Sequence, residues 1–408
     1  MKKIAVAVSA ALIAGSAMAA DVTVYGVIDT GFSYTSTREK VSDNYSDEYM
    51  NGYHSSTSEK KFSMDSGNSA GSRWGLKGSE DLGNGYKVGF KLESGFSSDT
   101  GKGSDDGLFN REATISVSGP FGAVYAGRMN ALISDGGSVG WYGAMASPFG
   151  SGWGDIAGHY AVMSTQSYKN NTLVYMSPRF SGLQFSAQYS MGDDGSENKS
   201  STDRYAAIGV DYQAGNLEIG FLADYMNKST GPYTFSWWKG TDPKKYIDQN
   251  AWTINLAANY DCGFAKSFIA AQYFKNVSDF TGITESIANG EVDYRGDERN
   301  ERKAYLKDKG REISLKGFGV NLGVDVPAFG GNVMVSIGYA DSDYRQEKEK
   351  VGKLKGYTAL VGYQYPFSKR TNVYAGAGYT RYKLDASDRS ASFKASKFQA
   401  LGGLKHTF

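Results

Sequence analysis

The sequence lacks several features on which small secreted proteins and enzymes depend. It has a single cysteine, Cys262, so an intramolecular disulfide is impossible and a small disulfide-stapled fold is excluded. It has only three histidines and contains neither a G-x-S-x-G nor an H-E-x-x-H pattern, which argues against a hydrolase of either kind. It also lacks a cofactor fingerprint. We therefore expect no enzymatic activity, no catalytic residues, no metal site and no cofactor.

Long apolar runs are also missing. After the N-terminal segment, no apolar run approaches the ~20 residues that a transmembrane helix needs. After Met1 the chain continues with two lysines, an apolar run over Ile4–Ala14 and small residues up to Ala20. This pattern is typical of a cleaved secretory signal peptide, and it allows cleavage after Ala19 or after Ala20. We expect a signal peptide over 1–20 and one domain over 21–408.

The chain also lacks an excess of charge of either sign. Loss of the two N-terminal lysines changes the formal net charge from +1 to −1, so the overall charge indicates no nucleic-acid partner. A signal peptide together with a polar chain leaves a membrane location open, because a closed barrel pairs its backbone groups between strands and spans lipid with a polar average composition.

Alternation of apolar and charged residues is the main pattern that the chain does contain. In 73–79 and 86–93, Lys77, Lys91 and Glu93 alternate with apolar residues and so fall on the opposite face of a strand. A soluble core would not accept long charged side chains at consecutive positions of one face. That face must therefore contact water, while the other contacts a protein core or lipid.

Sixteen strand-like segments follow one another, with connections that alternate between short and long. The segments are 21–36, 70–81, 86–97, 107–118, 122–129, 169–178, 183–191, 204–213, 217–226, 251–260, 266–275, 313–325, 332–343, 354–365, 372–383 and 395–408. The long connections are 37–69, 98–106, 129–168, 192–203, 227–250, 276–312, 344–353 and 384–394. One-sided loop lengths predict an all-β, 16-stranded antiparallel transmembrane β-barrel with short periplasmic turns and long extracellular loops. The alternative is a large secreted β-sandwich. A sandwich would not require long loops to lie on one side only.

Residues 129–168 form the most unusual connection. This Gly-rich, aromatic stretch of forty residues contains no Lys or Arg. A structureless loop of that length inside a compact domain is usually functional. We expect it to fold into the barrel as a gate. Its aromatic residues, which include Trp141, Tyr142, Phe149, Trp153 and Tyr160, either pack the loop against the wall or stack against a bound solute.

Several blocks of the chain resemble the general-diffusion porin family of Gram-negative outer membranes, of the beta-proteobacterial and neisserial type. These blocks are DVTVYGVIDTGF (21–32), GSRWGLKGSEDLGNGYKVGFKLESGF (71–96), LFNREATISVSGPFGAVYAGR (108–128), KNNTLVYMSPRFSGLQFSAQYS (169–190) and the ending GLKHTF. The resemblance implies a trimeric sixteen-stranded channel whose third long loop folds into the barrel.

The resemblance also implies a pore constriction in which basic residues of the wall face acidic residues of the loop. The wall positions that match are Arg73, Arg128 and Lys169, and the acids on the loop are Asp155 and Asp135. Arg111 matches a recurrent arginine, but it shares parity with Ala113, Ile115 and Val117, which predicts that it points away from the lumen.

Further wall residues are expected to face the lumen, namely Lys77, Lys87, Lys91, Glu93 and Glu112. The last strand places Phe398, Leu404 and Phe408 on one face, as expected for a strand that meets lipid, and we assign the terminal Phe408 as an assembly signal.

We predict an outer-membrane porin that forms a water-filled channel for passive diffusion of ions and small hydrophilic solutes, with a mild preference for anions. The expected partners are two further copies in a homotrimer, outer-membrane lipid and lipopolysaccharide, and the solutes themselves. The alternatives are a substrate-specific channel, a non-conducting adhesin or structural barrel, and a membrane-embedded hydrolase.

Overall fold

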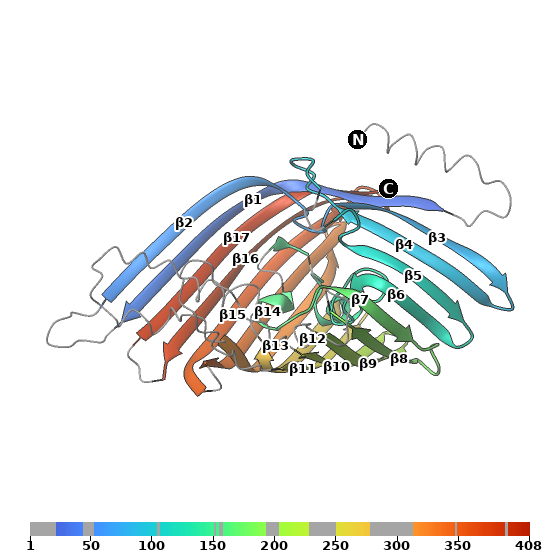
Figure 1. Ribbon diagram of the computed structural model, residues 1–408. Coiled ribbons are helices and arrows are strands. Elements are labelled where there is room, and N and C mark those ends of the chain that lie inside the picture. The colour runs from blue at the N-terminus through green and yellow to red at the C-terminus, as the bar shows by residue number, and fades with distance from the viewer. Residues whose placement is uncertain are drawn as a thin grey trace, which may run out of the picture.

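The computed structural model describes residues 22–43, 53–103, 107–150, 152–154, 158–192, 204–227, 250–277, 313–346, 349–387 and 391–408. They form one sheet of strands whose neighbours are all antiparallel (Figure 1). The first half comprises β1 (Thr23–Asp43), β2 (Tyr53–Ser66), β3 (Arg73–Gly83), β4 (Tyr86–Gly95), β5 (Glu112–Gly119), β6 (Gly122–Asn130), β7 (Tyr168–Met176) and β8 (Leu183–Ser190). The second half comprises β9 (Arg204–Ala214), β10 (Leu217–Asn227), β11 (Ala251–Asp261), β12 (Lys266–Val277), β13 (Ile313–Ala328), β14 (Gly331–Gln346), β15 (Glu349–Pro366), β16 (Thr371–Ala386) and β17 (Ala391–Thr407).

The sheet closes on itself because the first and last strands pair. The β1–β17 pairing runs without a break from Val27 opposite Thr407 to Asp43 opposite Ala391. On its other edge β1 pairs with both β2 and β3, which lie end to end. The seventeen strand segments therefore occupy sixteen positions around a closed antiparallel barrel, and the predicted fold is confirmed.

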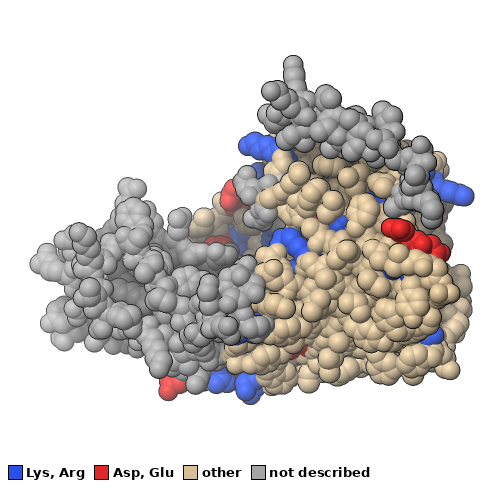
Figure 2. All heavy atoms as spheres, turned by 45° about the vertical axis from the view of Figure 1, so that its right-hand side comes forward, with Lys and Arg blue, Asp and Glu red and all other residues tan. Residues whose placement is uncertain are grey.

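Period two separates the two faces of the wall. Outward-facing residues such as Phe32, Leu76, Ile115 and Val361 are apolar, whereas the alternate positions face the interior. Figure 2 shows one side of the wall as a broad expanse without charge, with Lys, Arg, Asp and Glu mainly toward its margins. An uncharged band with polar margins is the surface that a barrel presents to a bilayer.

The described helices are short and lie between β6 and β7. They are α2 (Tyr142–Ala146) and the 3₁₀ turn η2 (Gly158–Ala161). Within the described part of the chain, no helix is long and apolar enough to cross a membrane.

Several expected loops are strands instead. The predicted connection 37–69 contains the end of β1 and all of β2, which pair from Thr30–Ser66 to Asp43–Tyr53. Only 347–348 separate β14 from β15, and only 387–390 separate β16 from β17. The strict alternation of short and long connections was therefore wrong at these places. β1 and β13–β17 have 16 to 21 residues, more than the 9–11 or so that a membrane crossing needs, so their hairpins extend beyond the bilayer.

The gap between β2 and β3 is organised around Asp29 of β1. This carboxylate is fully buried, and its Oδ2 accepts hydrogen bonds from the backbone N–H groups of Ser69 (2.9 Å) and Ala70 (2.7 Å). The hydroxyl of Tyr374 on β16 donates to Oδ1. The carboxylate thus satisfies backbone donors that the strand pairing leaves free, as buried polar groups require.

The chain end packs beside this region. Phe408 exchanges two backbone hydrogen bonds of 3.0 Å with Gly26 of β1, and its ring lies over the α-carbon of Gly26, where a side chain would overlap it. The terminal residue therefore completes the seam that closes the barrel.

Replacing Asp29 by alanine should destabilise the folded barrel. Two backbone N–H groups, one buried and one partly buried, would lose their acceptor at about 1–3 kcal/mol each, so we expect the free energy of unfolding to fall by about 2–6 kcal/mol. Urea unfolding of the refolded protein in detergent micelles, followed by tryptophan fluorescence, measures this. Tyr374→Phe removes one hydrogen bond and should cost less. A cost for Asp29→Ala no greater than that for Asp81→Ala, at an exposed position near the end of β3, would contradict the assignment.

Candidate pore constriction

The segment between β6 and β7 lies inside the barrel, along the inner surface of the wall (Figure 1). We call residues 131–167 the inner loop. Its backbone is tied to β8 where Leu132 donates to Gln188 (2.9 Å), and to β13 where Asn321 donates to the Ala146 carbonyl (3.2 Å). Its far end reaches the gap between β2 and β3, where the N–H of Gly154 donates to the carbonyl of Asn68 (3.1 Å). The predicted infolding of 129–168 is therefore observed.

The part of the inner loop that leads back to β7 is also hydrogen-bonded to the wall. Ser164 and the side chain of Gln272 on β12 exchange two hydrogen bonds of 2.7 Å, and Tyr382 of β16 donates to the Ala161 carbonyl (2.6 Å). Interior side chains of the wall thus supply the donors and acceptors that irregular backbone needs away from bulk water.

Inward-facing glycines of the wall make room for the loop. A Cβ on Gly319 of β13 would overlap the carbonyl oxygen of Val162, and one on Gly220 of β10 would lie 2.8 Å from the sulfur of Met145. Gly362 of β15 and Gly376 of β16 likewise lie under the Trp153 ring. Glycine inside a strand often marks the close approach of another backbone, and here these residues form the seat of the inner loop.

The aromatic residues of the loop face this seat. Tyr142, Phe149 and Trp153 are buried, and Trp153 packs edge-on against Phe149 and Tyr374 with ring centroids 5.4 Å and 5.3 Å apart. Burial raises the pKa of the Tyr142 phenol well above its ordinary value, so it remains a neutral donor to the Leu256 carbonyl (3.2 Å). Trp141 is partly buried and donates from its indole N–H to Ser186 (3.3 Å). These rings hold the loop to the wall.

The opposite wall carries a cluster of ion pairs on β3–β5. Glu93 accepts from Arg111 at 2.7 Å and lies 3.8 Å from Arg73, while Lys91 lies 2.8 Å from Glu112 and 3.7 Å from Glu93. The inner loop touches this cluster where the Ser138 hydroxyl donates to Glu112.

Two tyrosines complete the cluster. Tyr25 of β1 donates to Glu93 (2.9 Å), and the ammonium groups of Lys77 and Lys91 lie 5.3 Å and 5.8 Å from its ring centroid. Such distances allow cation–π attraction between each ammonium group and the ring.

Arg111 and Arg128 share the second tyrosine, each with its guanidinium 5.5 Å from the ring centroid of Tyr168. Arg128 lies in a β-bulge, where the pairing register shifts between Gly127 and Met129 and Gly127 adopts a φ of 130°. A bulge re-aims the side chain that it contains. The Arg128 guanidinium consequently donates to the Asn110 carbonyl (2.7 Å) beside Arg111.

Acids and bases of the cluster differ in exposure. The side chains of Glu93 and Glu112 are 5% and 1% exposed, whereas those of Arg73, Lys91 and Arg111 are 26%, 20% and 21% exposed. The carboxylates therefore lie behind the cations, and the basic groups form the accessible surface.

The structure brings together only some of the predicted constriction residues. Arg73 and Arg128 belong to the cluster, whereas Lys169 lies apart at the base of the loop, where its Nζ donates to Gln166 (2.7 Å) and lies 4.8 Å from the ring centroid of Tyr205. Asp135 folds back within its own loop against Gly150. Asp155 lies outside the described residues.

The predicted wall residues follow the expected parity. Lys77 pairs directly opposite Lys91, and Glu93 opposite Glu112, so these four share the interior face. Lys87 is on the same face of β4 near its short turn, opposite Asp81 and Ser118.

The prediction for Arg111 was wrong. It precedes β5, which begins at Glu112, so strand parity does not apply to it, and its side chain reaches inward to Glu93. Sequence reasoning also missed Tyr25, Asp29 and Lys405, which lies opposite Asp29 in the β1–β17 pairing. Strict alternation along the last strand, opposite to Leu404, would have found Lys405.

Comparison with known proteins identifies the family of the chain. The sequence profile described as Gram-negative porin matches residues 5–385. The chain belongs to the Gram-negative porin family. An outer membrane porin protein of Bordetella pertussis is 31% identical over the whole of both chains, and a major outer membrane protein P.IB of Neisseria meningitidis serogroup B is 32% identical over 93% of each.

Solved structures share the fold. An anion-selective porin from Comamonas acidovorans superposes with a TM-score of 0.63 at 21% identity, covering 96% of this chain and all of that one. A trimer form of OmpT from Vibrio cholerae superposes with a TM-score of 0.57 at 12% identity, covering 96% and 100%. This porin is therefore an outer-membrane channel for passive diffusion and not an enzyme, as predicted.

Filling the seat of the loop should narrow the channel. Gly319→Ala would push the backbone at Val162 away from the wall and toward the barrel axis, so we expect a lower single-channel conductance and a stability loss of about 1–3 kcal/mol from overpacking. Planar-bilayer recordings measure the conductance. The control, Ala359→Val, adds methyl groups on the lipid-facing side of β15 and should leave it unchanged. Equal conductance in parent and Gly319→Ala would show that Gly319 does not position the loop.

Proposed function

We propose that solutes pass between the inner loop and the basic wall formed by Arg73, Lys77, Lys91, Arg111 and Arg128, and that this passage favours anions. One observation carries the proposal, which is that the carboxylates of Glu93 and Glu112 are buried while the cations paired with them are partly exposed. A passing ion therefore meets ammonium and guanidinium groups first.

The mechanism follows from electrostatics in a narrow aqueous passage. Charges of one sign on a low-dielectric wall focus their field into the water beside them and raise the local concentration of counter-ions. Pairing with Glu93 and Glu112 fixes the side chains of Arg111 and Lys91, so the field stays in place as a solute passes. Because the screening length is about 8 Å at physiological ionic strength, the preference is expected to be mild and to weaken in concentrated salt.

The constriction differs from the one first expected. Neutralisation of the wall cations comes from the wall itself, through Glu93 and Glu112, and Asp135 contributes little because its carboxylate is turned into the loop. We retain Asp155 as the acid of the loop that would face Arg73 and Arg128, and we assign Lys169 to holding the loop base.

Relatives support the wider proposal. The Comamonas acidovorans neighbour is described as anion-selective, and the OmpT neighbour as a trimer. We infer that this porin also forms a homotrimer, that its outer surface contacts lipid and lipopolysaccharide, that Phe408 is its assembly signal, and that 1–20 is removed on export. Native mass spectrometry of the detergent-extracted protein tests the trimer.

A substrate-specific channel is the second candidate, since ordered charges can also form a binding ladder. Burial of Tyr142, Phe149 and Trp153 removes these aromatic surfaces from a passing solute and argues against a stacking site for sugars or nucleosides. Saturable block of single-channel current by one solute would favour this candidate.

Neutralising exposed cations of the wall should shift ion selectivity. In Arg73→Gln/Lys77→Gln we expect the reversal potential in a tenfold salt gradient to move toward the cation value, because two positive charges leave the passage. The double variant Arg381→Gln/Lys60→Gln loses the same charge from the outward face and is the matched control. Cation preference in the parent protein, or an equal shift in both double variants, would contradict the proposal.

A further inference from the structure

One neutral side chain lies among the charges of the basic wall. Tyr25 of β1 is directly opposite Gly75 of β3, and Gly75 is directly opposite Glu93 of β4. The phenol crosses over Gly75, and its hydroxyl donates to Glu93 (2.9 Å). A Cβ on Gly75 would lie 2.7 Å from the hydroxyl oxygen, so the glycine makes room for the ring. Tyr25 therefore reaches across three neighbouring strands.

The ring of Tyr25 is held at both ends. Its backbone is paired within the sheet, and the carboxylate that accepts from its hydroxyl also accepts from Arg111 at 2.7 Å. That carboxylate belongs to the buried Glu93. A lysine, in contrast, carries its charge on a flexible stem of four carbons. The ring is therefore a fixed surface against which flexible side chains can be ordered.

Two directly opposed lysines use this surface. Lys77 of β3 faces Lys91 of β4 in the pairing register, and their ammonium groups lie 5.3 Å and 5.8 Å from the centroid of the Tyr25 ring. Like charges directly opposite each other in a sheet repel. Attraction of both ammonium groups to one ring opposes that repulsion and keeps the two charges at one place on the wall.

The two lysines differ in what else holds them. Lys91 lies 2.8 Å from Glu112 and 3.7 Å from Glu93. Lys77 is the more exposed of the two, and within the described part of the chain it forms no ion pair. Its contact with the Tyr25 ring therefore decides where its ammonium group lies in the passage.

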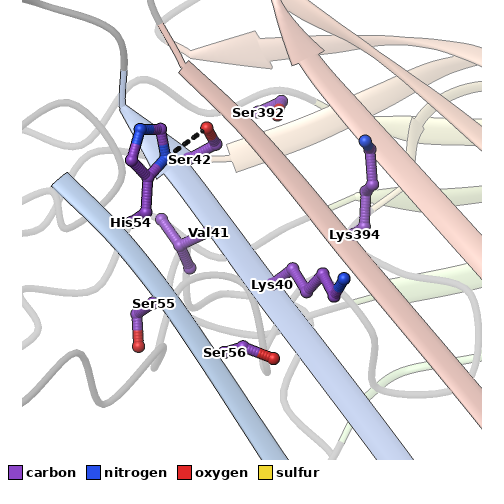
Figure 3. Close-up of a pocket in the computed structure, with 8 residues that line it drawn as sticks. All are labelled: Lys40, Val41, Ser42, His54, Ser55, Ser56, Ser392 and Lys394. Atoms are coloured by element: carbon purple, nitrogen blue, oxygen red, sulfur yellow. Dashed lines mark hydrogen bonds between the residues drawn. The ribbon is translucent and has the colours of Figure 1, made fainter. Parts of the chain in front are cut away.

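Another pair of opposed lysines lacks such a ring. Lys40 of β1 faces Lys394 of β17 on the outward face, where both line a hollow of about 360 Å³ (Figure 3). The described residues that line this hollow include no tyrosine, phenylalanine or tryptophan. The close-up shows the two lysine side chains extending in different directions. Opposed lysines without a shared ring thus separate.

We propose that Tyr25 is a positioning residue for ion selectivity, whose ring holds the ammonium groups of Lys77 and Lys91 together so that a passing anion meets two charges at once. This role rests on the anion preference proposed above and assigns part of that preference to a neutral side chain. An exposed cation–π contact favours the held position about 2- to 5-fold. Without the ring, Lys77 would turn away from Lys91 into the water of the lumen, and the field that attracts anions would weaken.

Reversal potentials in a tenfold salt gradient across a planar bilayer test the proposal. Tyr25→Leu removes the ring and should lower the anion-to-cation permeability ratio by about 2-fold, because the two charges separate. Tyr25→Phe keeps the ring and should stay close to the parent. The matched control, Tyr363→Leu, loses a half-buried tyrosine with one hydrogen bond on the outward face of β15 and should leave the ratio unchanged.

A double-mutant cycle separates positioning from a structural role. Lys77→Gln should lower the permeability ratio of the parent, and its effect should be smaller in the Tyr25→Leu background, where Lys77 is already displaced. If Tyr25 served folding alone, Lys77→Gln would have the same effect in both backgrounds. Tyr25→Met, which also lacks a ring, replaces the leucine variant in the cycle if that variant does not refold.

Three results would overturn the inference. They are an equal effect of Lys77→Gln with and without the ring, a Tyr25→Leu channel as selective as the parent, and a Tyr25→Phe channel as altered as Tyr25→Leu. A Lys77→Gln channel as selective as the parent would contradict the proposed anion passage at Lys77 and this role of Tyr25 together. The cycle therefore distinguishes failure of the positioning role alone from failure of the proposed function.

Discussion

Pairing of backbone groups is the constraint on which this structure depends. Within the hydrocarbon of a bilayer an unpaired N–H or C=O costs several kcal/mol, and a closed sheet is one of the few structures that leaves none. The uninterrupted β1–β17 pairing supplies the closure. Where the pairing does fail, between β2 and β3, the buried carboxylate of Asp29 takes over the backbone donors of Ser69 and Ala70. The acidic side chain of Asp29 in the wall thus serves the same need, which is to pair every backbone N–H group.

A closed barrel of sixteen strands has a lumen too wide for wall side chains to fill. Narrowing that lumen requires a further segment of the chain. The inner loop is that segment, and it packs an apolar layer against the inner wall, with Tyr142, Phe149 and Trp153 seated over glycines such as Gly362 and Gly376. The apolar core of the protein therefore lies between loop and wall. As a result, the loop occupies one side of the lumen and leaves the charged surface of β3–β5 accessible.

Sequence alone predicted most of this architecture because period two is a direct consequence of strand geometry. It predicted one shared face for Lys77, Lys91, Glu93 and Glu112, and the register pairs Lys77 with Lys91 and Glu93 with Glu112. It failed for Arg111, since that residue lies outside a strand and a long side chain can turn inward from the end of one.

The sequence predicted the strand face of a residue better than it predicted the contacts of that residue or the ends of the strands. Lys169 precedes a recognisable block, yet its contact with Tyr205 depends on how the loop base packs, which no local pattern encodes. The extended hairpin of β1 and β2 was read as a loop because it is polar on both faces beyond the membrane, where the alternation that marks a buried strand disappears.

Lysines on the two faces of the wall show how the same side chain acquires different roles. Lys91 points inward and is held by Glu112 and Glu93, so its charge is fixed and partly compensated. Lys40 and Lys394 point outward and face each other, and the described residues supply them with no carboxylate. Since the pairing register decides the face, a shift of one residue between β1 and β17 would turn one of the two groups toward the lumen. The unbroken register of the closing seam therefore fixes the charge on both the passage and the outward surface.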